Sequence, residues 1–386
     1  MCLFGRAGGV NSLGSRFFAL VKAMAPNNFA MVMATGIISV ALLRLGCPWG
    51  AWFFHGVNAC LYAALWTLLL IRLIRYPAAV AADFKSHLKG PPFLTIVAGT
   101  AIIGTQSALL AHHVAAAGAL FWLGAVCWAF ILWGVFFAIF TRVPKPSLGC
   151  GINGAWLLAT VSTEALVILG ATLGAPAGWD AALVYFCLCA LFSVGVVLYL
   201  FVITGIFFRF CFTDMLAAEL DPTYWINASA AAATALAGTA LMGRAGAAPL
   251  MGLVLPYISG ITMLAWAAAS WWVPMLMLLG FWRHFVLRYP FTYTPAYWSM
   301  VFPLGMYTAC TSAISDAFGV PGLMAVPCVF IFFALGAWAV TLAGLVRSRG
   351  RALLKGTALP AQEYCRTEKA PLPGNADNGA GRPQGR

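Results

Sequence analysis

The stretch that decides the fold is residues 117–140, AGALFWLGAVCWAFILWGVFFAIF, which contains no charged side chain. A helix needs about 20 apolar residues to cross the hydrocarbon core of a bilayer. Over all 386 residues, 62% are hydrophobic and 8% are charged, with a mean hydropathy of +0.91. Because a soluble domain carries about 25% charged residues, this composition excludes a cytosolic enzyme, a secreted disulfide-rich domain and a disordered chain. The sequence predicts an all-α integral membrane protein.

Stretches of similar length and composition recur along the chain. They predict ten transmembrane helices, near residues 26–46, 51–74, 93–113, 117–140, 151–173, 178–208, 223–243, 250–282, 294–315 and 318–346. Residues 16–25 are too short and too charged to span, and predict an interfacial helix. The expected organisation is a cytoplasmic N-terminal segment with this helix (1–25), a ten-helix transmembrane pore domain (26–346) and a disordered cytoplasmic tail (347–386).

Basic residues fix the expected orientation. Of the 22 lysines and arginines, only Arg44 and Arg244 fall on the side away from the termini. The positive-inside rule therefore predicts a multi-pass protein of the cell (inner or plasma) membrane with both termini in the cytoplasm. The basic loops recur at a spacing of roughly 65–70 residues, which indicates five helical hairpins in a row. These loops account for the net charge of +12, so no nucleic-acid partner is predicted.

Alternate spans differ in composition. The odd-numbered spans are rich in serine, threonine and glycine, whereas the even-numbered spans carry most aromatic residues. Small and hydroxylated residues suit close helix contacts or a wet surface, and large rings suit lipid. One interpretation is an inner ring of odd helices around a narrow pore, and the alternative is close packing around a solid core. The pore-lining candidates are Thr35, Gly36, Ser39, Thr100, Gly104, Thr160, Thr163, Thr234, Gly238 and Thr308.

Three motifs resemble one family. They are residues 31–39 (MVMATGIIS) in the first span, 154–170 (GAWLLATVSTEALVILG) in the fifth and 298–305 (WSMVFPLG) in the ninth. These segments are similar to motifs of the tellurite-resistance/dicarboxylate transporter family, which includes TehA-like bacterial proteins, the yeast malate permease and sulfite pump, and the plant slow anion channels. The resemblance extends from about residue 20 to residue 345.

The resemblance implies a homotrimer with one pore in each subunit, lined by the odd helices with quasi-five-fold symmetry. By motif position it implies that Phe302 occludes the pore and that Pro303 kinks the helix beside this gate. A benzyl ring in a narrow bore excludes water and hydrated ions, and its rotation opens a path.

The span interiors contain neither lysine nor arginine. An anion there must be held weakly by hydroxyl groups, backbone N–H groups and helix dipoles, while the basic loops raise its local concentration. Glu164 is the exception, because it is the only ionisable side chain near the middle of a span, and such residues are functional by default. It is a candidate proton or substrate site; the alternative is a carboxyl tucked between helices and bonded to hydroxyls such as those of Thr160 and Ser162.

The expected function is transport of small anions without chemistry on the substrate. Inorganic anions, sulfite-like or tellurite-like oxyanions and C4-dicarboxylates all remain candidates, as does a proton-coupled carrier of weak acids that uses Glu164. A membrane-embedded enzyme is a remote alternative, because no catalytic carboxylates or histidines cluster at one depth. Most cysteines lie in apolar runs without metal-ligand spacing, so the sequence predicts no metal, no cofactor and no disulfide.

Overall fold

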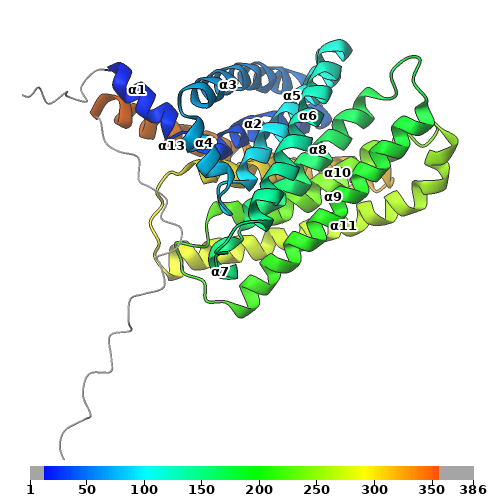
Figure 1. Cartoon of the computed structure of the whole chain (residues 1–386). Coiled ribbons are helices and arrows are strands. Elements are labelled where there is room, and N and C mark those ends of the chain that lie inside the picture. The colour runs from blue at the N-terminus through cyan, green and yellow to red at the C-terminus, as the bar shows by residue number, and fades with distance from the viewer. Residues whose placement is uncertain (1–12, 356–386) are drawn as a thin grey trace, which may run out of the picture.

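The computed structural model describes residues 13–355, which contain helices and no strand (Figure 1). Eight helical segments in this range are long and apolar enough to cross a bilayer, which confirms the predicted all-α membrane fold. They are Pro26–Arg44, Pro48–Arg75, Pro91–Leu109, Val114–Phe140, Gly154–Leu173, Ala181–Phe212, Pro249–Val286 and Pro321–Arg351.

The described chain forms five consecutive pairs of long helices. The first members are α2 (Ala30–Arg44), α5 (Thr95–Leu109), α8 (Leu158–Leu173), α10 (Ile226–Met242) and α12 (Trp298–Ala317). Their longer partners are α3 (Pro48–Arg75), α6 (Val114–Phe140), α9 (Ala181–Phe212), α11 (Pro249–Phe281) and α13 (Ala325–Lys355). These ten helices correspond to the ten predicted spans.

One predicted boundary is wrong. Helix α13 continues beyond residue 346 to Lys355, so residues 347–355 are helical although they were expected to be disordered. Their sequence, RSRGRALLK, consists largely of arginine, alanine, leucine and lysine, which favour helix and let the preceding helix propagate. The rest of the predicted tail lies outside the described residues.

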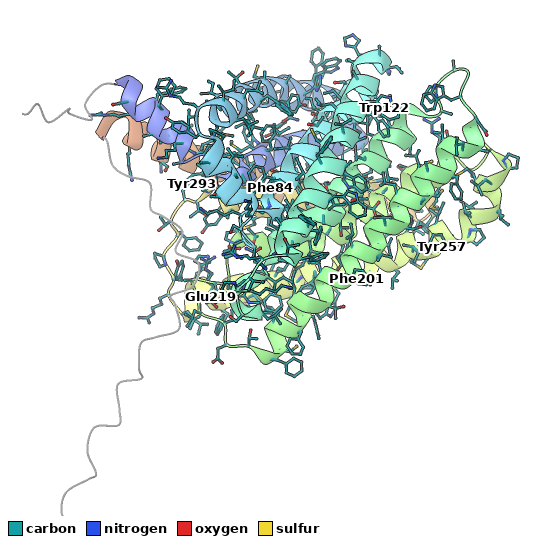
Figure 2. The ribbon with its side chains drawn as sticks, viewed as in Figure 1. Phe84, Trp122, Phe201, Glu219, Tyr257 and Tyr293 are labelled. Carbon is teal, nitrogen blue, oxygen red and sulfur yellow. The ribbon has the colours of Figure 1, made fainter. Side chains whose placement is uncertain are left out.

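The first members of the pairs form a closed ring. Helix α2 packs on α5, α5 on α8, α8 on α10, α10 on α12, and α12 again on α2. Each longer helix packs outside on the first helix of its own pair. Between 78% and 83% of the apolar span residues are buried in α2, α5 and α8, against 17–22% in the outer helices. Outer side chains such as Phe201, 73% exposed, project from the periphery (Figure 2).

Helices α10 and α12 are not among the eight strongly apolar segments. Almost all of their residues are buried by neighbouring helices. A helix that does not face lipid needs no apolar surface for it, so alanine, serine and threonine suffice. The ring arrangement favours a full membrane crossing by both α10 and α12, and this crossing stays a prediction.

Each inner helix begins with a short 3-10 turn. The five turns are η1 (Pro26–Phe29), η2 (Pro91–Leu94), η3 (Gly154–Leu157), η4 (Pro222–Trp225) and η6 (Pro295–Tyr297), and neighbours among them contact each other in a closed circle. Four begin with proline, which suits a first helical position because it lacks a backbone N–H and has a preset φ angle. The start of every inner helix is therefore encoded locally, and all five starts lie at one end of the ring.

A hydrogen bond links each outer helix to the inner helix of the next pair. Three are made by indole N–H groups, from Trp128 to Thr163 at 2.8 Å, from Trp266 to Thr311 at 3.1 Å and from Trp338 to Thr35 at 3.0 Å. The other two join the hydroxyls of Tyr62 and Thr100 at 3.0 Å, and the Tyr199 hydroxyl to the Asn227 carbonyl at 3.5 Å. We call these five contacts the inter-hairpin hydrogen bonds.

The inter-hairpin hydrogen bonds explain why tryptophan and tyrosine gather on the outer helices. Their rings supply apolar bulk, and their single polar group finds a partner inward. The Thr100 hydroxyl itself donates to the Ile96 carbonyl at 2.7 Å, which makes Tyr62 the donor in its pair. Because the last bond runs from α13 back to α2, the five contacts close the circle.

The two ends of the described chain lie together. Helix α1 (Leu13–Lys22) packs on α3 and on α13, and Figure 1 shows α1 beside the end of α13. An even number of crossings puts both ends on one side of a membrane. The cytoplasmic location of that side, and the interfacial position of α1, remain predictions.

Replacing Trp128 with phenylalanine tests the inter-hairpin hydrogen bonds. The change keeps an aromatic ring and removes the N–H that Thr163 accepts. Loss of one such bond costs about 1 kcal/mol, which lowers the midpoint of thermal unfolding by about 2 °C in a protein of this size. Trp133→Phe on the same helix is the control, because that side chain is 71% exposed. Equal midpoints for the two variants would contradict the assignment.

Candidate functional site

Phe302 lies on α12 with only 1% of its surface exposed. Tyr307 and Thr311 of the same helix bond to Ser270 and Trp266 of the outer helix α11, at 2.8 and 3.1 Å. The nine residues from Phe302 to Thr311 amount to two and a half turns. Phe302 therefore occupies the face of α12 that is turned away from α11.

Pro303 stands next to Phe302 inside α12. Its ring removes the N–H that would bond the carbonyl four residues earlier. The first turns of α12 are therefore held less firmly by backbone hydrogen bonds than the remainder of the helix.

Four predicted pore-lining hydroxyls are used between helices. Thr35, Thr100 and Thr163 accept or share the inter-hairpin hydrogen bonds from the outer helices. Ser39 donates to the Ala51 carbonyl of α3 at 2.6 Å. These four hydroxyls are engaged by the outer helices, and the pore-lining role of their residues stays a prediction.

Three predicted pore-lining glycines are also contact points. A Cβ atom added to Gly36 would lie 2.4 Å from Ile102, one added to Gly104 would lie 2.7 Å from Leu169, and one added to Gly238 would lie 1.8 Å from Thr262. Each glycine lets a neighbouring helix approach closely. Close packing, the alternative in the sequence analysis, is therefore the role of these small residues.

The last three pore-lining candidates differ in the hydrogen bonds that their hydroxyls make. Thr308 donates to the Leu304 carbonyl of its own helix at 2.8 Å. Thr234 donates to its own helix and to Glu164. The hydroxyl of Thr160 is buried without a hydrogen-bond partner, so it is free to bind water.

Glu164 is fully buried on α8. Its Oε1 accepts from the Thr234 hydroxyl of α10 at 3.3 Å, and its Oε2 has no partner. A Cβ atom at Gly195 of α9 would lie 2.2 Å from Oε1. The carboxyl thus lies in the seam between α8, α9 and α10, on the side of the outer ring. The expected hydroxyl contact exists, but it comes from α10, because Ser162 donates to the Ala159 carbonyl instead.

Sequence reasoning missed three buried amides. Asn58 of α3 donates to Gln106 of α5 at 2.7 Å, beside Gly36 of α2. Asn227 of α10 is fully buried, and neither atom of its side-chain amide has a partner. A buried amide without a partner costs free energy. An asparagine or glutamine inside an apolar span was the available signal, which a search for ionisable groups passed over.

A cavity of about 540 Å³ opens where the inner helices begin. All five 3-10 turns contribute to its wall, through Pro26, Pro92, Ala155, Thr223 and Pro295. The positive ends of five helix dipoles therefore converge around it. We call this cavity the vestibule.

The charged side chains of the vestibule are mostly basic. They are Lys22, Arg72, Lys89, Arg349 and Asp83. The carboxylate of Asp83 pairs with Arg72 at 2.5 Å and with Lys89 at 3.2 Å. Together with the helix dipoles, the remaining positive charge attracts anions.

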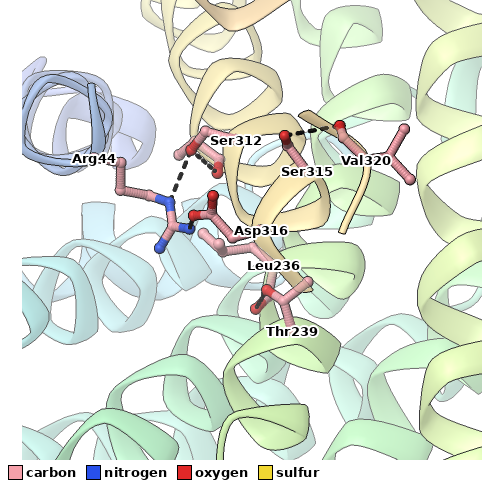
Figure 3. Close-up of polar contacts among 8 residues, drawn as sticks. Arg44, Leu236, Thr239, Ser312, Ser315, Asp316 and Val320 are labelled. Carbon is pink, nitrogen blue, oxygen red and sulfur yellow. Dashed lines mark hydrogen bonds and ion pairs between the residues drawn. The ribbon is translucent and has the colours of Figure 1, made fainter. Parts of the chain in front are cut away.

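At the opposite end of the ring, two arginines are held by polar partners. Arg44 of α2 donates to the Ser312 hydroxyl and pairs with Asp316 of α12, both at 2.8 Å (Figure 3). Arg244 donates to the carbonyls of Ala171 and Thr172 at the end of α8, both at 2.7 Å. A cation suits the negative end of a helix dipole. The electrostatic attraction for an anion is therefore concentrated at the vestibule.

The expectation of no disulfide is wrong at one position. Cys150, on the short helix α7 (Leu148–Gly151), is disulfide-bonded. It lies between the fourth and fifth apolar spans, so the argument from apolar surroundings did not apply to it. Within residues 13–355, no group of three or more histidine, cysteine, aspartate or glutamate side chains could hold a metal ion.

A closed ring of helices with a basic vestibule at one end is the arrangement of a membrane protein that transports anions. Residues 23–346 match the family model described as the voltage-dependent anion channel. The chain belongs to this family, which is the tellurite-resistance/dicarboxylate transporter and slow anion channel family that its motifs resemble. Family and relatives indicate a transporter and not an enzyme.

Curated relatives support the same class. An uncharacterised transporter of Methanocaldococcus jannaschii is 22% identical over 317 residues, which is 78% of this chain and 87% of the relative. An uncharacterised membrane protein of Mycobacterium tuberculosis is 32% identical over 129 residues, or 33% of this chain. The chain spans 65% of the length of that mycobacterial relative.

Replacing Gly195 with alanine tests the position of Glu164. The new methyl group overlaps the carboxyl, so we expect overpacking to destabilise the protein by about 1 kcal/mol or more. In a Glu164→Ala background the same change should cost much less, a coupling that a double-mutant cycle measures by thermal unfolding. Gly260→Ala on α11 is the control, because a Cβ atom there meets nothing within 4 Å. Additive effects of the two changes would argue against the contact.

Proposed function

We propose that the protein conducts small anions along the axis of its inner ring and that Phe302 closes this path. The observation that carries the proposal is the basic vestibule at the common start of five inner helices, opposite an end where Arg44 pairs with Asp316 and Arg244 binds helix-end carbonyls. Inorganic anions, sulfite-like and tellurite-like oxyanions and C4-dicarboxylates are the candidate substrates.

The surroundings of Phe302 support a gate. Its ring is buried on the face of α12 that is turned from the outer helix. An aromatic ring at a constriction excludes water and hydrated ions. Pro303 removes one backbone hydrogen bond beside it, so a rotation of the ring needs only a local change of α12.

The inner helices hold an anion weakly in this proposal. Within α2, α5, α8, α10 and α12 the only lysine or arginine is Arg44, at the last residue of α2. Most of their hydroxyls are already hydrogen-bonded, many of them to a carbonyl of their own helix. An ion that is held weakly can leave quickly, which suits conduction. The proposal includes the cytoplasmic orientation of the vestibule and the cell membrane as its location, as the basic loops predict, and a homotrimer, as the family resemblance implies.

Phe302→Ala should raise anion flux. In proteoliposomes containing the full chain, we expect an increase of about tenfold or more, because the bulky ring no longer closes the bore and a tenfold change corresponds to about 1.4 kcal/mol. Flux of chloride, nitrate, sulfite, tellurite and malate would be measured with and without a pH gradient. Phe332→Ala is the control, since that side chain is 73% exposed on α13.

The pattern of fluxes decides the proposal. A rise for Phe302→Ala but not for Phe332→Ala supports a central gate. Unchanged flux in a folded Phe302→Ala protein, for every anion in the panel, overturns it. Equal increases in both variants would mean a leak through the disturbed bundle.

A second candidate function rests on Glu164. A carboxyl that is fully buried and half unpartnered can exchange a proton during transport of a weak acid. We expect wild-type malate uptake to be stimulated by an inward proton gradient and abolished by an uncoupler, and Glu164→Gln to lose this dependence while keeping downhill flux. An unchanged pH profile in Glu164→Gln would leave Glu164 a structural residue.

A further inference from the structure

A line of buried polar groups runs along the seam between α8, α9 and α10. It begins at Glu164 near the middle of α8 and leads toward the ends of these helices at the vestibule side. The seam is separate from the interior of the ring, because α9 belongs to the outer helices and Gly195 of α9 lies against the Glu164 carboxyl.

The register of the three helices is set by two contacts. Thr234 of α10 bonds Glu164 of α8, and Tyr199 of α9 bonds the Asn227 carbonyl of α10. Asn227 is seven residues before Thr234, which is two turns or about 10 Å along the helix. Tyr199 is one turn beyond Gly195. The step from Thr234 to Asn227 along α10 and the step from Gly195 to Tyr199 along α9 both lead from Glu164 toward the same end of the bundle.

Four buried polar atoms along this line lack protein partners. Thr160 is one turn before Glu164 on the same face of α8, and its buried hydroxyl is unpartnered. Both side-chain atoms of Asn227 and the Oε2 atom of Glu164 are unpartnered as well. Buried polar groups that no protein atom satisfies are the places where internal water binds.

The line ends at a polar cluster near the surface. Arg209, at the end of α9, donates to the Ile152 carbonyl at 2.5 Å and to the Tyr224 hydroxyl at 2.6 Å. It also pairs with Glu219 at 3.4 Å, whose side chain is 19% exposed. Figure 2 shows Glu219 at this end of the bundle. From Gly195 to Arg209 is fourteen residues, or about 21 Å of helix.

Few titratable groups face the seam. Helices α5 and α10 and the turns η2 and η3 carry none, and α6 carries Cys127 only. Tyr199 of α9 lies along the line, with Arg209, Glu219 and Tyr224 at its surface end. No second carboxylate lies near Glu164 among these elements, so a proton carried along this line is accepted at Glu164.

We propose that water bound by Thr160 and Asn227 connects Glu164 to the surface near Glu219, and that this line carries protons. A hydronium ion at the surface gives up one proton, hydrogen bonds along the water line shift by one position, and Glu164 Oε2 gains the O–H bond and becomes neutral. The reverse shift releases the proton. This inference deepens the carrier form of the proposed function by naming a proton route distinct from the anion path.

Infrared spectroscopy of the full chain in lipid nanodiscs tests the route without any transport. The carboxyl C=O band that disappears in Glu164→Gln belongs to protonated Glu164, and its shift after transfer to heavy water reports proton access. We expect this exchange to slow by about tenfold or more in Asn227→Leu and in the isosteric Thr160→Val, a change that corresponds to about 1.4 kcal/mol of barrier. Ser162→Ala on α8 is the control, because its hydroxyl bonds the Ala159 carbonyl.

The outcomes separate this route from the proposed function. Slow exchange in Thr160→Val and Asn227→Leu, but not in Ser162→Ala, supports the route even if anion flux is unchanged. Unchanged exchange in folded Thr160→Val overturns it, and so does the absence of any band that is sensitive to Glu164→Gln. If Asn227→Leu does not fold, Thr160→Val alone decides. Failure of the Phe302→Ala test leaves these results unaffected.

Discussion

The inner helices are shielded from lipid on every side, and the rest of the structure depends on this shielding. A helix of alanine, glycine, serine and threonine has little apolar surface to offer a bilayer. The outer helices supply that surface, and the inter-hairpin hydrogen bonds join each of them to the next pair. Because the fifth bond returns to α2, the arrangement has no open edge. No inner helix therefore has to present an apolar surface to lipid.

This use of the hydroxyls has a consequence for transport. Thr35, Thr100 and Thr163 serve the contact with the outer ring, so they add little polarity to the interior. The proposed path along the axis then relies on the helix dipoles and the charges of the vestibule, both of which act on any small anion.

Charge is distributed in two separate places. Basic side chains in excess of the single carboxylate line the vestibule, while the arginines at the opposite end are bound to carbonyls, a hydroxyl or Asp316. The buried carboxyl of Glu164 is in neither place, since it faces α9 and α10. A carboxylate on the axis would repel anions, whereas one in the outer seam can change its protonation without blocking them.

The amino-acid sequence by itself determined where the long helices lie along the chain. The apolar runs predicted all ten long helices, with most of their ends within a few residues, and the motifs around Thr35, Glu164 and Phe302 indicated the family. These features are local, because helix length and the cost of exposing polar groups to lipid depend on the residues of one segment. The disulfide of Cys150 and the helical residues 347–355 were missed, since no local rule decided them.

Tertiary structure decided which way each side chain points. Composition placed Thr35, Gly36 and Gly104 on inner helices, but only the neighbours showed that they make helix contacts. The same holds for Glu164, whose partners come from α9 and α10 and not from its own helix. A helical sequence fixes the angle between its side chains, but the direction of the whole face is set by the helices that pack around it.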